Sequence, residues 1–381
     1  MYSGQKGMFA SRPAAGSVRF EALQSLRGLA ALTVVIRHVL ACYPIPDHLT
    51  TVIVFFFFNS PAAVTLFFVL SGFVLTHSLE RQSLTLPTLL TFWTRRVFRI
   101  LPCVMAVSLL SYLYIRSPLS AWPIEGSDPF MTGLLPHDMP LSPFLFLKCM
   151  LSLSGALVPQ NWTVMVELIA ALFFPFLWVA STKGARAFLP LAIVTLLLAA
   201  FAPAGGKGLP FIYAFSFVAG MVAYRAWQNT TVTLTGVGLL LAAVGMSLPT
   251  TVLTEPETLG AVFSSPRLVI PEAVFSALLL FGLARGGAVA RALSCRPLLW
   301  LGNISYSIYL LHFLIIAIAG RLLSPLLPNL SMTAREGLVL GLTLILVLPL
   351  SHLLYETVEK PVNRLGHRVA SLLFKPRSHT A

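Results

Sequence analysis

The chain has 381 residues, of which 57% are hydrophobic and only 10% are charged, and its mean hydropathy is +0.84. Soluble domains carry roughly 25% charged residues, so this composition excludes a water-soluble globular enzyme. The formal net charge of +13 comes from short basic clusters between apolar runs and not from one continuous stripe. We therefore attribute the basic residues to membrane topology and to contact with membrane lipid, and expect no nucleic-acid partner.

Apolar segments of about 17–25 residues, the length that crosses a bilayer as a helix, recur along almost the whole sequence. We predict an all-α, polytopic integral membrane protein of about ten transmembrane helices, because a helix satisfies its own backbone hydrogen bonds in lipid. The first apolar run contains Arg37 and His38 and lacks a convincing cleavage site, which favours a retained helix over a signal peptide. The predicted spans are 28–44, 62–79, 99–116, 163–181, 187–203, 209–224, 232–249, 268–284, 298–320 and 336–355.

One further apolar segment, 143–158, decides the orientation of everything after it. It contains Lys148, and if it does not cross the membrane, most lysines and arginines fall on the side that holds both termini. The positive-inside rule then places both termini in the cytoplasm and 143–158 at the outer face, as a re-entrant or interfacial segment. We expect a disordered cytoplasmic N-terminus over 1–18, a membrane-embedded domain over 19–368 and a basic cytoplasmic tail over 369–381.

The cysteines give no sign of a disulfide framework or of a metal centre. They fall in or beside apolar segments and lack the paired spacing that zinc sites use. We predict no disulfide and no metal. The cysteines are Cys42, Cys103, Cys149 and Cys295.

Two ionisable residues share one face of the first predicted helix. Burying such a group at mid-bilayer costs about 2.5–3.5 kcal/mol, so intramembrane charges are functional candidates. Arg27 and His38 are separated by ten residues, which at about 100° per residue brings them to nearly the same face, with His38 near the midplane. The alternative is that Arg27 only anchors the topology and His38 is a hydrogen-bonded core residue. Arg37 lies on another face, and the sequence assigns it no role.

A cluster of three arginines, Arg95, Arg96 and Arg99, stands at the entrance to the third predicted span. Guanidinium groups on one helical turn repel one another unless an anion lies among them, and their planar forks match phosphate oxygens. This arginine cluster therefore indicates a phosphate site. The alternative is a stop-transfer signal whose side chains face lipid headgroups.

Glu167 enters a strongly apolar predicted helix without a neighbouring cation. Its partner must therefore come from another part of the fold, and Arg37, His38 and His312 are the candidates. The alternative is a protonated Glu167 that only packs helices together.

Smaller polar groups occur in two more spans. Ser71 and Gly72 form a small pair in the second span, for which close helix packing is the favoured role. In the ninth span Tyr306, Tyr309 and His312 follow one another at one-turn intervals, so their side chains can line one cavity wall. Tyrosine is common at membrane interfaces, whereas a histidine in mid-span is not.

Taken together and in this order, the segments resemble the membrane-bound acyltransferase 3 family of bacterial O-acyltransferases, from Leu23 to Arg364. Each motif is weak alone, and the combination is specific. The departures are Arg37 directly before the histidine and Thr163 where serine is frequent. The motifs are Arg27-x10-His38, FFVLSGFVL at 67–75, Arg96-x-x-Arg99, Trp162 with Glu167, YSIYLLH at 306–312 and ETVEKP at 356–361.

The resemblance implies an enzyme that moves an acyl group, usually acetyl, from cytoplasmic acyl-CoA to a hydroxyl group. The acceptor is commonly a carbohydrate outside the bacterial inner membrane, either extracytoplasmic or lipid-linked, and other hydroxylated molecules fit as well. The resemblance thus implies acyl-CoA as the co-substrate, with acetyl-CoA as the first candidate, and it implies no metal.

The resemblance also implies roles for the polar residues. His38 would be the base that takes the hydroxyl proton as the new bond forms, and Glu167 would orient it or bind the acceptor. A covalent acyl-histidine route is the other option. The phosphates of CoA would bind to Arg27, Arg95, Arg96 and Arg99. The acceptor or the pocket would be lined by Ser71, Trp162, Tyr306, Tyr309 and His312.

Two other function classes fit a polytopic protein with charges near the midplane. One is a transporter or exporter of a lipid-linked sugar or small solute, for which the sequence shows no inverted halves. The other is a sensor that binds lipid or acyl-CoA without turnover.

Overall fold

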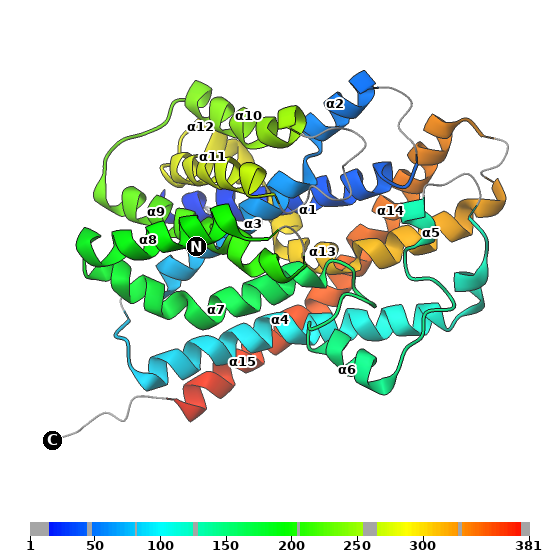
Figure 1. Ribbon diagram of the computed structural model, residues 1–381, viewed down its shortest axis with the longest axis horizontal. Helices are drawn as coiled ribbons and strands as arrows, with labels where there is room; N and C mark the ends of the chain where they lie inside the picture. Colours follow the sequence, from blue (N-terminus) through cyan, green and yellow to red (C-terminus); the bar gives the residue numbers. More distant parts are fainter. Residues whose placement is uncertain are drawn as a thin grey trace, which may run out of the picture.

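The computed structural model describes residues 15–43, 48–80, 82–124, 129–203, 206–253, 265–326 and 330–374. These residues form helices joined by turns, and no strand occurs among them, which confirms the all-α prediction. Figure 1 shows an elongated bundle whose helices run mostly along its long axis.

The helices begin and end as follows. In chain order they are α1 (Ala15–Leu40), α2 (His48–Phe57), α3 (Ser60–Leu79), α4 (Leu86–Ile115), α5 (Pro129–Thr132), α6 (Pro143–Met150), α7 (Asn161–Thr182), α8 (Ala185–Phe201), α9 (Leu209–Asn229), α10 (Gly236–Leu253), α11 (Pro266–Ala284), α12 (Ala288–Leu293), α13 (Arg296–Leu323), α14 (Met332–Leu354) and α15 (Lys360–Leu373). Short 3-10 turns are η1 (Pro118–Ala121), η2 (Gly206–Gly208) and η5 (Ser324–Leu326), and η6 (Tyr355–Glu359) is a π-helical turn. The predicted domain limits at 19 and 368 therefore cut into α1 and α15, because both helices extend beyond them.

Eight helical segments in the described ranges are long and apolar enough to cross a membrane. Two shorter apolar helices, Ala185–Phe201 and Gly236–Val252, coincide with the predicted spans 187–203 and 232–249. The other predicted spans each fall on one of the longer segments, so the prediction of about ten membrane helices is confirmed. The longer segments are Phe20–Leu40, Val52–Leu79, Leu86–Ile115, Asn161–Thr182, Gly206–Asn229, Pro266–Ala284, Arg296–Leu326 and Met332–Leu373.

Two predicted spans are too short, because hydropathy does not show where a helix begins or ends. α4 starts at Leu86 and not at residue 99, since the Thr85 side chain caps it by accepting a hydrogen bond from the Thr88 nitrogen (3.3 Å). The arginine cluster therefore lies inside a helix.

The sequence also predicts that Pro361 stops the last helix, which is wrong. Pro361 occupies the first turn of α15, where its missing N–H is not needed, and the helix continues to Leu373.

The segment 143–158 does not form a spanning helix. α6 has eight residues, about 12 Å at 1.5 Å per residue, which is too short to cross a bilayer. The chain then turns at Ser152, whose φ is 62°, and the Ser152 hydroxyl donates a hydrogen bond to the Asn161 side chain at the start of α7 (2.8 Å). The prediction of a non-crossing segment is confirmed.

Glycines let the central helices approach closely. A Cβ atom on Gly28 of α1 would lie 2.6 Å from the Gly302 nitrogen of α13, and one on Gly72 of α3 would lie 2.1 Å from the Phe217 oxygen of α9. Small residues at such contacts allow backbones to pack directly, which stabilises helix pairs in lipid. The predicted packing role of Gly72 is confirmed.

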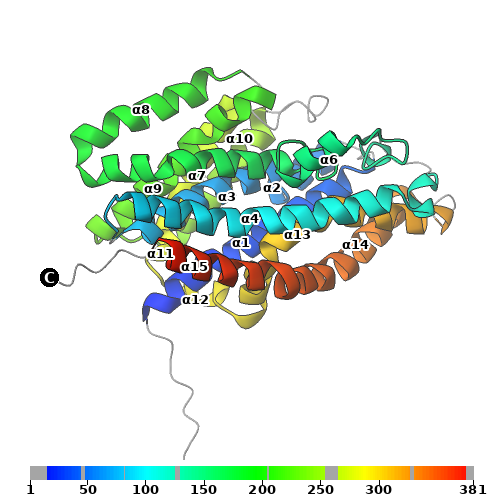
Figure 2. The same cartoon turned by 90° about the horizontal axis from the view of Figure 1, so that it is seen from below.

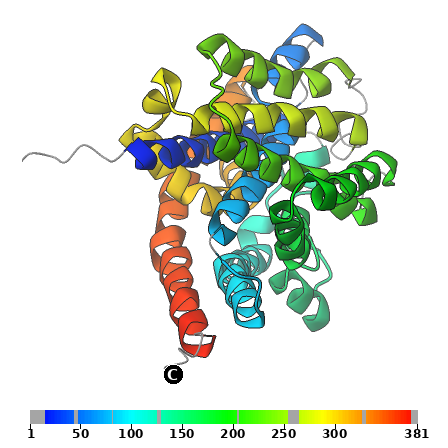
Figure 3. The ribbon, with the colours of Figure 1, turned by 90° about the vertical axis from the view of Figure 1, so that its left-hand side faces the viewer.

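α4 and α15 lie side by side on one flank of the bundle, and α8 and α10 lie away from them (Figure 2, Figure 3). The start of α1, the end of α3, the start of α4 and the end of α15 share one end of the bundle, which we call the terminal face. At the opposite end lie η1, α5 and α6 (Figure 1).

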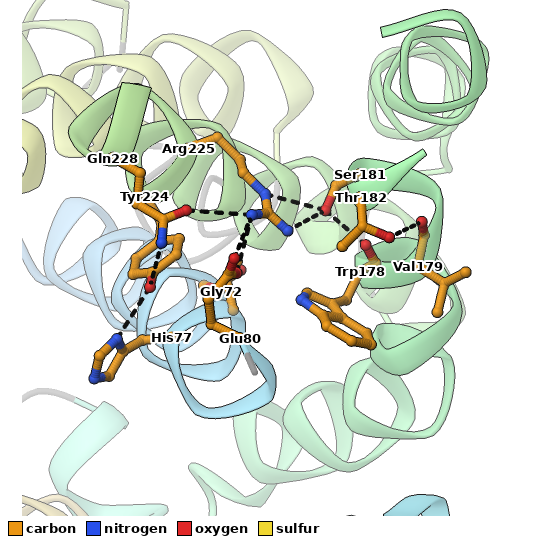
Figure 4. A network of polar contacts seen from close by, with 11 residues as sticks. Gly72, His77, Glu80, Trp178, Val179, Ser181, Thr182, Tyr224, Arg225 and Gln228 are labelled. Atoms are coloured by element: carbon orange, nitrogen blue, oxygen red, sulfur yellow. Dashed lines mark hydrogen bonds and ion pairs between the residues drawn. The ribbon is translucent and has the colours of Figure 1, made fainter. Parts of the chain in front are cut away.

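A polar network ties α3, α7 and α9 together near the terminal face (Figure 4). Arg225 Nη1 donates hydrogen bonds to both carboxylate oxygens of Glu80 (3.0 and 2.9 Å), and its Nη2 donates to the Ser181 hydroxyl (3.1 Å). The Tyr224 hydroxyl lies 3.1 Å from His77 Nδ1. The network fixes the end of α3, whose side chains line the pocket described below.

We predict that Gly72→Ala lowers the melting temperature of the protein in detergent. The new methyl group would meet the Phe217 carbonyl, and overpacking of this kind costs about 1–3 kcal/mol. Gly341→Ala is the matched control, because Gly341 is also a helix glycine but has no such atom within 4 Å. This control should keep or raise the melting temperature. Equal values for the two variants in scanning fluorimetry would contradict the packing role.

Candidate active site

A partly open pocket of about 490 Å³ lies between α1, α3, α4, α7, α13 and α15. Ligand pockets typically measure about 300–1,000 Å³, so this volume suits a small molecule. Three predicted site residues, His38, Trp162 and His312, are not part of its lining. The predicted residues that line it are Arg27, Ser71, Arg95, Arg96, Arg99, Glu167, Tyr306 and Tyr309.

Four guanidinium groups converge on the pocket from two helices. Arg95, Arg96 and Arg99 come from α4, and Arg27 comes from α1. In the described part of the chain, Arg95 and Arg99 form no ion pair. The pocket therefore carries an excess of positive charge that can bind an anionic ligand.

Glu167 is paired with an arginine of the pocket. Its Oε1 atom accepts hydrogen bonds from Arg96 Nη1 (3.3 Å) and from the Ser71 hydroxyl (3.1 Å). The sequence suggested other partners, which is wrong, because α7 lies beside α3 and α4 and these helices bring Ser71 and Arg96 to the carboxylate. The partners suggested by the sequence were Arg37, His38 and His312.

Arg27 joins α1 to α13 at the pocket wall. Its Nε atom donates a hydrogen bond to the Ser305 hydroxyl (2.8 Å), and its Nη2 atom donates to the Gly302 carbonyl oxygen (2.9 Å). The Gln24 side chain, about one turn earlier, donates to Asn303 of α13. These bonds hold the guanidinium on the pocket surface in a fixed position.

A second carboxylate, Glu359, lies behind the arginines. It belongs to η6, is buried, and accepts a hydrogen bond from the Ser307 hydroxyl (2.9 Å). It also interacts electrostatically with Arg27 and Arg99. π-helical turns are rare and recur at functional sites, and this one places a carboxylate that offsets part of the charge of two pocket arginines.

His38 and His312, the histidine pair, stack on each other outside the pocket lining. Their ring centroids are 5.1 Å apart at 26°, and the Phe313 ring lies 4.6 Å from that of His38. His312 Nδ1 lies 2.6 Å from the Tyr309 carbonyl oxygen, and because a carbonyl only accepts, this nitrogen carries the hydrogen. His312 Nε2 and His38 Nδ1 are buried without a hydrogen-bond partner among the described residues. Two imidazole nitrogens are thus left for a ligand.

Tyr309 connects the pocket with the histidine pair. It lines the pocket, and its ring centroid lies 5.6 Å from that of His312. Its hydroxyl is 3.0 Å from the Thr163 hydroxyl, and Phe67 packs edge-on against its ring (5.8 Å). Tyr309 therefore borders the pocket, and its ring and that of His312 form a series of ring contacts from the pocket to His38.

The remaining predicted residues have other surroundings. Trp162 packs on Tyr213 of α9, with ring centroids 5.6 Å apart, instead of lining the pocket. The Tyr306 hydroxyl donates a hydrogen bond to a backbone carbonyl of α4 (3.0 Å). Arg37 is buried and lies 4.0 Å from the centre of the Phe55 ring, in a cation–π contact.

The family of the chain follows from comparison with known proteins. A family model described as an acyltransferase domain matches residues 20–354. The chain belongs to the acyltransferase 3 family. Acyltransferase MdmB of Streptomyces mycarofaciens is 27% identical over an alignment 388 residues long. The alignment covers 91% of this chain and 92% of the relative. No solved structure matches the chain.

Membership identifies the protein as an acyltransferase, in preference to the exporter and the sensor that the sequence left open. None of the four cysteines of this acyltransferase, all of which lie in the described ranges, forms a disulfide. Within the described ranges, no group of three or more His, Cys, Asp and Glu side chains could hold a metal ion.

The sequence did not single out several pocket residues of the acyltransferase, two of which lie on α15. Asn363 and His367 of α15 line the pocket together with the arginine cluster. No local signal marks them, because a proline followed by a polar stretch indicates the end of a membrane helix.

A buried acidic residue was also missed, although a signal for it exists. Glu272 lies inside the predicted span 268–284, where any carboxylate is a candidate for a special role. It is fully buried and accepts hydrogen bonds from the Thr65 hydroxyl (2.7 Å) and the Thr250 hydroxyl (2.6 Å). It joins α3, α10 and α11 and does not line the pocket.

We predict that Arg96 and Glu167 stabilise the protein jointly. Removing either residue leaves a partly buried charge unpaired, whereas removing both does not. The loss of stability in the double alanine variant should therefore be smaller than the sum of the two single losses, by about 0.5–3 kcal/mol.

Chemical unfolding of the four proteins in detergent measures this coupling. Arg95→Ala combined with Glu167→Ala is the control and should be additive, since Arg95 is exposed and forms no ion pair in the described ranges. Additive losses in the Arg96 cycle as well would contradict the stabilising pair.

Proposed function

We propose that the protein is an acyl-CoA-dependent O-acyltransferase of the bacterial inner membrane. It moves an acyl group from cytoplasmic acyl-CoA to a hydroxyl group of an extracytoplasmic or lipid-linked carbohydrate. Acetyl is the first candidate for this acyl group. The observation that carries this proposal is a pocket lined by four arginines and by Tyr309, whose ring contacts one member of a stacked histidine pair. Groups that bind a polyanionic donor thus adjoin groups that can accept a proton.

Both termini are cytoplasmic in this proposal, so the terminal face and the pocket mouth are cytoplasmic as well. The positive-inside rule supports this orientation, because exposed arginines gather at this end of the bundle. They include Arg95 near the start of α4, Arg186 at the start of α8 and Arg291 of α12.

The donor is held through its phosphates. The four pocket arginines offer planar forks to phosphate oxygens, and the Glu167 and Glu359 carboxylates offset only part of their charge. A CoA thioester bound in this way directs its pantetheine arm into the bundle, toward Tyr309. The Tyr309 side chain then rotates out of the way, and the thioester carbonyl reaches the histidine pair.

His38 takes the proton of the acceptor. The hydroxyl oxygen attacks the thioester carbonyl carbon, the carbon–sulfur bond breaks, and the proton passes through the imidazole to the sulfur, which leaves as the thiol of CoA. Nδ1 of His38 is buried and unpartnered in the described ranges, so it is the atom that accepts this proton. His312 stacks on His38 and is itself fixed by the Tyr309 carbonyl, so it holds the ring in place. Glu167 is bound to Arg96 and therefore acts on the donor side.

The acceptor reaches the histidine pair from the end of the bundle opposite the terminal face. Phe130 of α5 lies there, 36% exposed, with its ring centroid 6.0 Å from that of His38. An exposed aromatic face suits the C–H face of a sugar ring, and the imidazole nitrogens supply partners for sugar hydroxyls. These features support a carbohydrate acceptor.

We predict that His38→Ala abolishes acyl transfer and leaves the affinity for acyl-CoA nearly unchanged, because His38 is outside the donor pocket. Transfer is measured with labelled acetyl-CoA and purified protein in detergent, with a panel of sugars and extracted glycolipids as acceptors. His352→Ala, exposed on α14 and outside the pocket, is the matched control and should transfer normally. Normal turnover in His38→Ala would remove this histidine from the chemistry, and no transfer by the unaltered protein would refute the proposed function.

We predict that Arg99→Ala raises the Kd for acetyl-CoA roughly tenfold or more, since a hydrogen bond to a charged group contributes about 1.5–3 kcal/mol. Isothermal titration calorimetry measures the change. Arg186→Ala removes an exposed arginine that does not line the pocket and should leave the Kd unchanged. If both variants bind acetyl-CoA as the unaltered protein does, the phosphate assignment is wrong.

A further inference from the structure

α15 forms part of the pocket although it lies after residues 20–354, the part of the chain that the family model matches. It runs along α4 on the same flank of the bundle (Figure 2). Gly366 of α15 is buried, and a Cβ atom on it would lie 2.4 Å from the Cβ atom of Phe98. α15 is therefore held in direct contact with the helix that carries the arginine cluster.

The turn before α15 is tied to the pocket as well. Glu359, the last residue of η6, is buried against Ser307 and interacts electrostatically with Arg27 and Arg99. α15 begins at the next residue, Lys360. Its direction is therefore fixed at its start by a carboxylate among the arginines and at its middle by the contact with α4.

α15 presents Asn363 and His367 to the pocket. These residues are one helical turn apart, so their side chains lie on one face. His367 interacts electrostatically with Arg95 and Arg99, which places it beside the outer part of the arginine cluster. His367 and Arg95 are both exposed, so this part of the pocket is its mouth.

The mouth differs chemically from the interior of the pocket. The interior holds Arg27, Arg96, Arg99 and Glu167. Besides Arg95 and His367, the lining includes uncharged hydrogen-bonding side chains from the end of α3, the start of α4 and the turn between them. A ligand whose phosphates lie among the arginines extends its other end into this polar region. The uncharged side chains there are Ser78, Gln82, Thr88 and Thr91.

We propose that Asn363 and His367 form an adenine subsite, an inference that rests on acyl-CoA being the donor. An asparagine amide matches the adjacent donor and acceptor on the adenine edge with two hydrogen bonds. The imidazole offers a flat ring on which the base stacks and a ring nitrogen that donates to the ribose 3′-phosphate. α15 thereby favours donors that carry the nucleotide over simpler thioesters of the same acyl group.

Binding measurements test this subsite without knowledge of the acceptor. CoA and 4′-phosphopantetheine, which lacks the adenosine 3′,5′-bisphosphate part of CoA, are titrated into the purified full-length protein in detergent. The ratio of the two dissociation constants is then compared between variants, so that contacts to the missing phosphates are the same in every variant except where the altered residue makes them. We expect Asn363→Ala and His367→Ala each to lower the preference for CoA roughly tenfold, the effect of losing one base contact. Arg368→Ala, on the same helix, exposed and outside the pocket, is the matched control and should keep the original preference.

Each outcome separates the subsite from the proposed function. An unchanged preference in both alanine variants overturns the subsite and leaves acyl-CoA as the donor. An equal loss of affinity for both ligands also overturns it, because α15 then only supports the shape of the pocket. No binding of CoA to the unaltered protein overturns both proposals.

His367→Phe keeps the subsite testable if an alanine variant proves unstable. Phenylalanine retains a flat ring, so we expect most of the preference for CoA to remain. A tenfold or larger loss of the preference for CoA in His367→Phe, relative to the unaltered protein, would overturn the stacking contact. Both positions lie at the helix surface and alanine favours helix, so the alanine variants are expected to fold.

Discussion

A charged side chain inside a membrane-embedded helix bundle needs a partner. The ion pair between Arg96 and Glu167 meets this requirement in the pocket. It joins α4 to α7, and Ser71 adds α3 through the same carboxylate oxygen. These three helices form walls of the pocket. Because the pair neutralises one arginine internally, the charges of Arg95 and Arg99 are left to face a ligand. The bundle thus turns its charges toward one cavity and away from lipid.

Close backbone packing makes the rest of this arrangement possible. Arg27 reaches the Gly302 carbonyl and the Ser305 hydroxyl because Gly28 lets α1 touch α13. A larger residue at this contact would move the guanidinium off the pocket wall. Packing between small residues therefore positions a functional charge as well as stabilising the helix pair.

Tyr309 lies between the arginine pocket and the histidine pair, which are the donor half and the acceptor half of the proposed site. Its side chain lines the arginine pocket, and its backbone carbonyl fixes the hydrogen on His312 Nδ1. The stacked His38 ring lies beyond it, near the aromatic residues of the opposite end. In the proposed reaction the two substrates enter from opposite ends, and the thioester passes the tyrosine to reach the histidine pair. One residue then governs both access of the thioester and the orientation of the histidine pair.

The sequence by itself determined the all-α membrane fold, the positions of about ten helices and the residue types of the site, because hydropathy, helical periodicity and the clustering of arginines are local properties. It did not determine which side chains meet. Glu167 pairs with Arg96 because of how α7 packs beside α4, and such contacts join residues far apart in the chain. The helix continues past Pro361 because α15 rests on α4, so Asn363 and His367 reach the pocket. Only the tertiary structure could decide these points, since they depend on helix packing and not on the segments themselves.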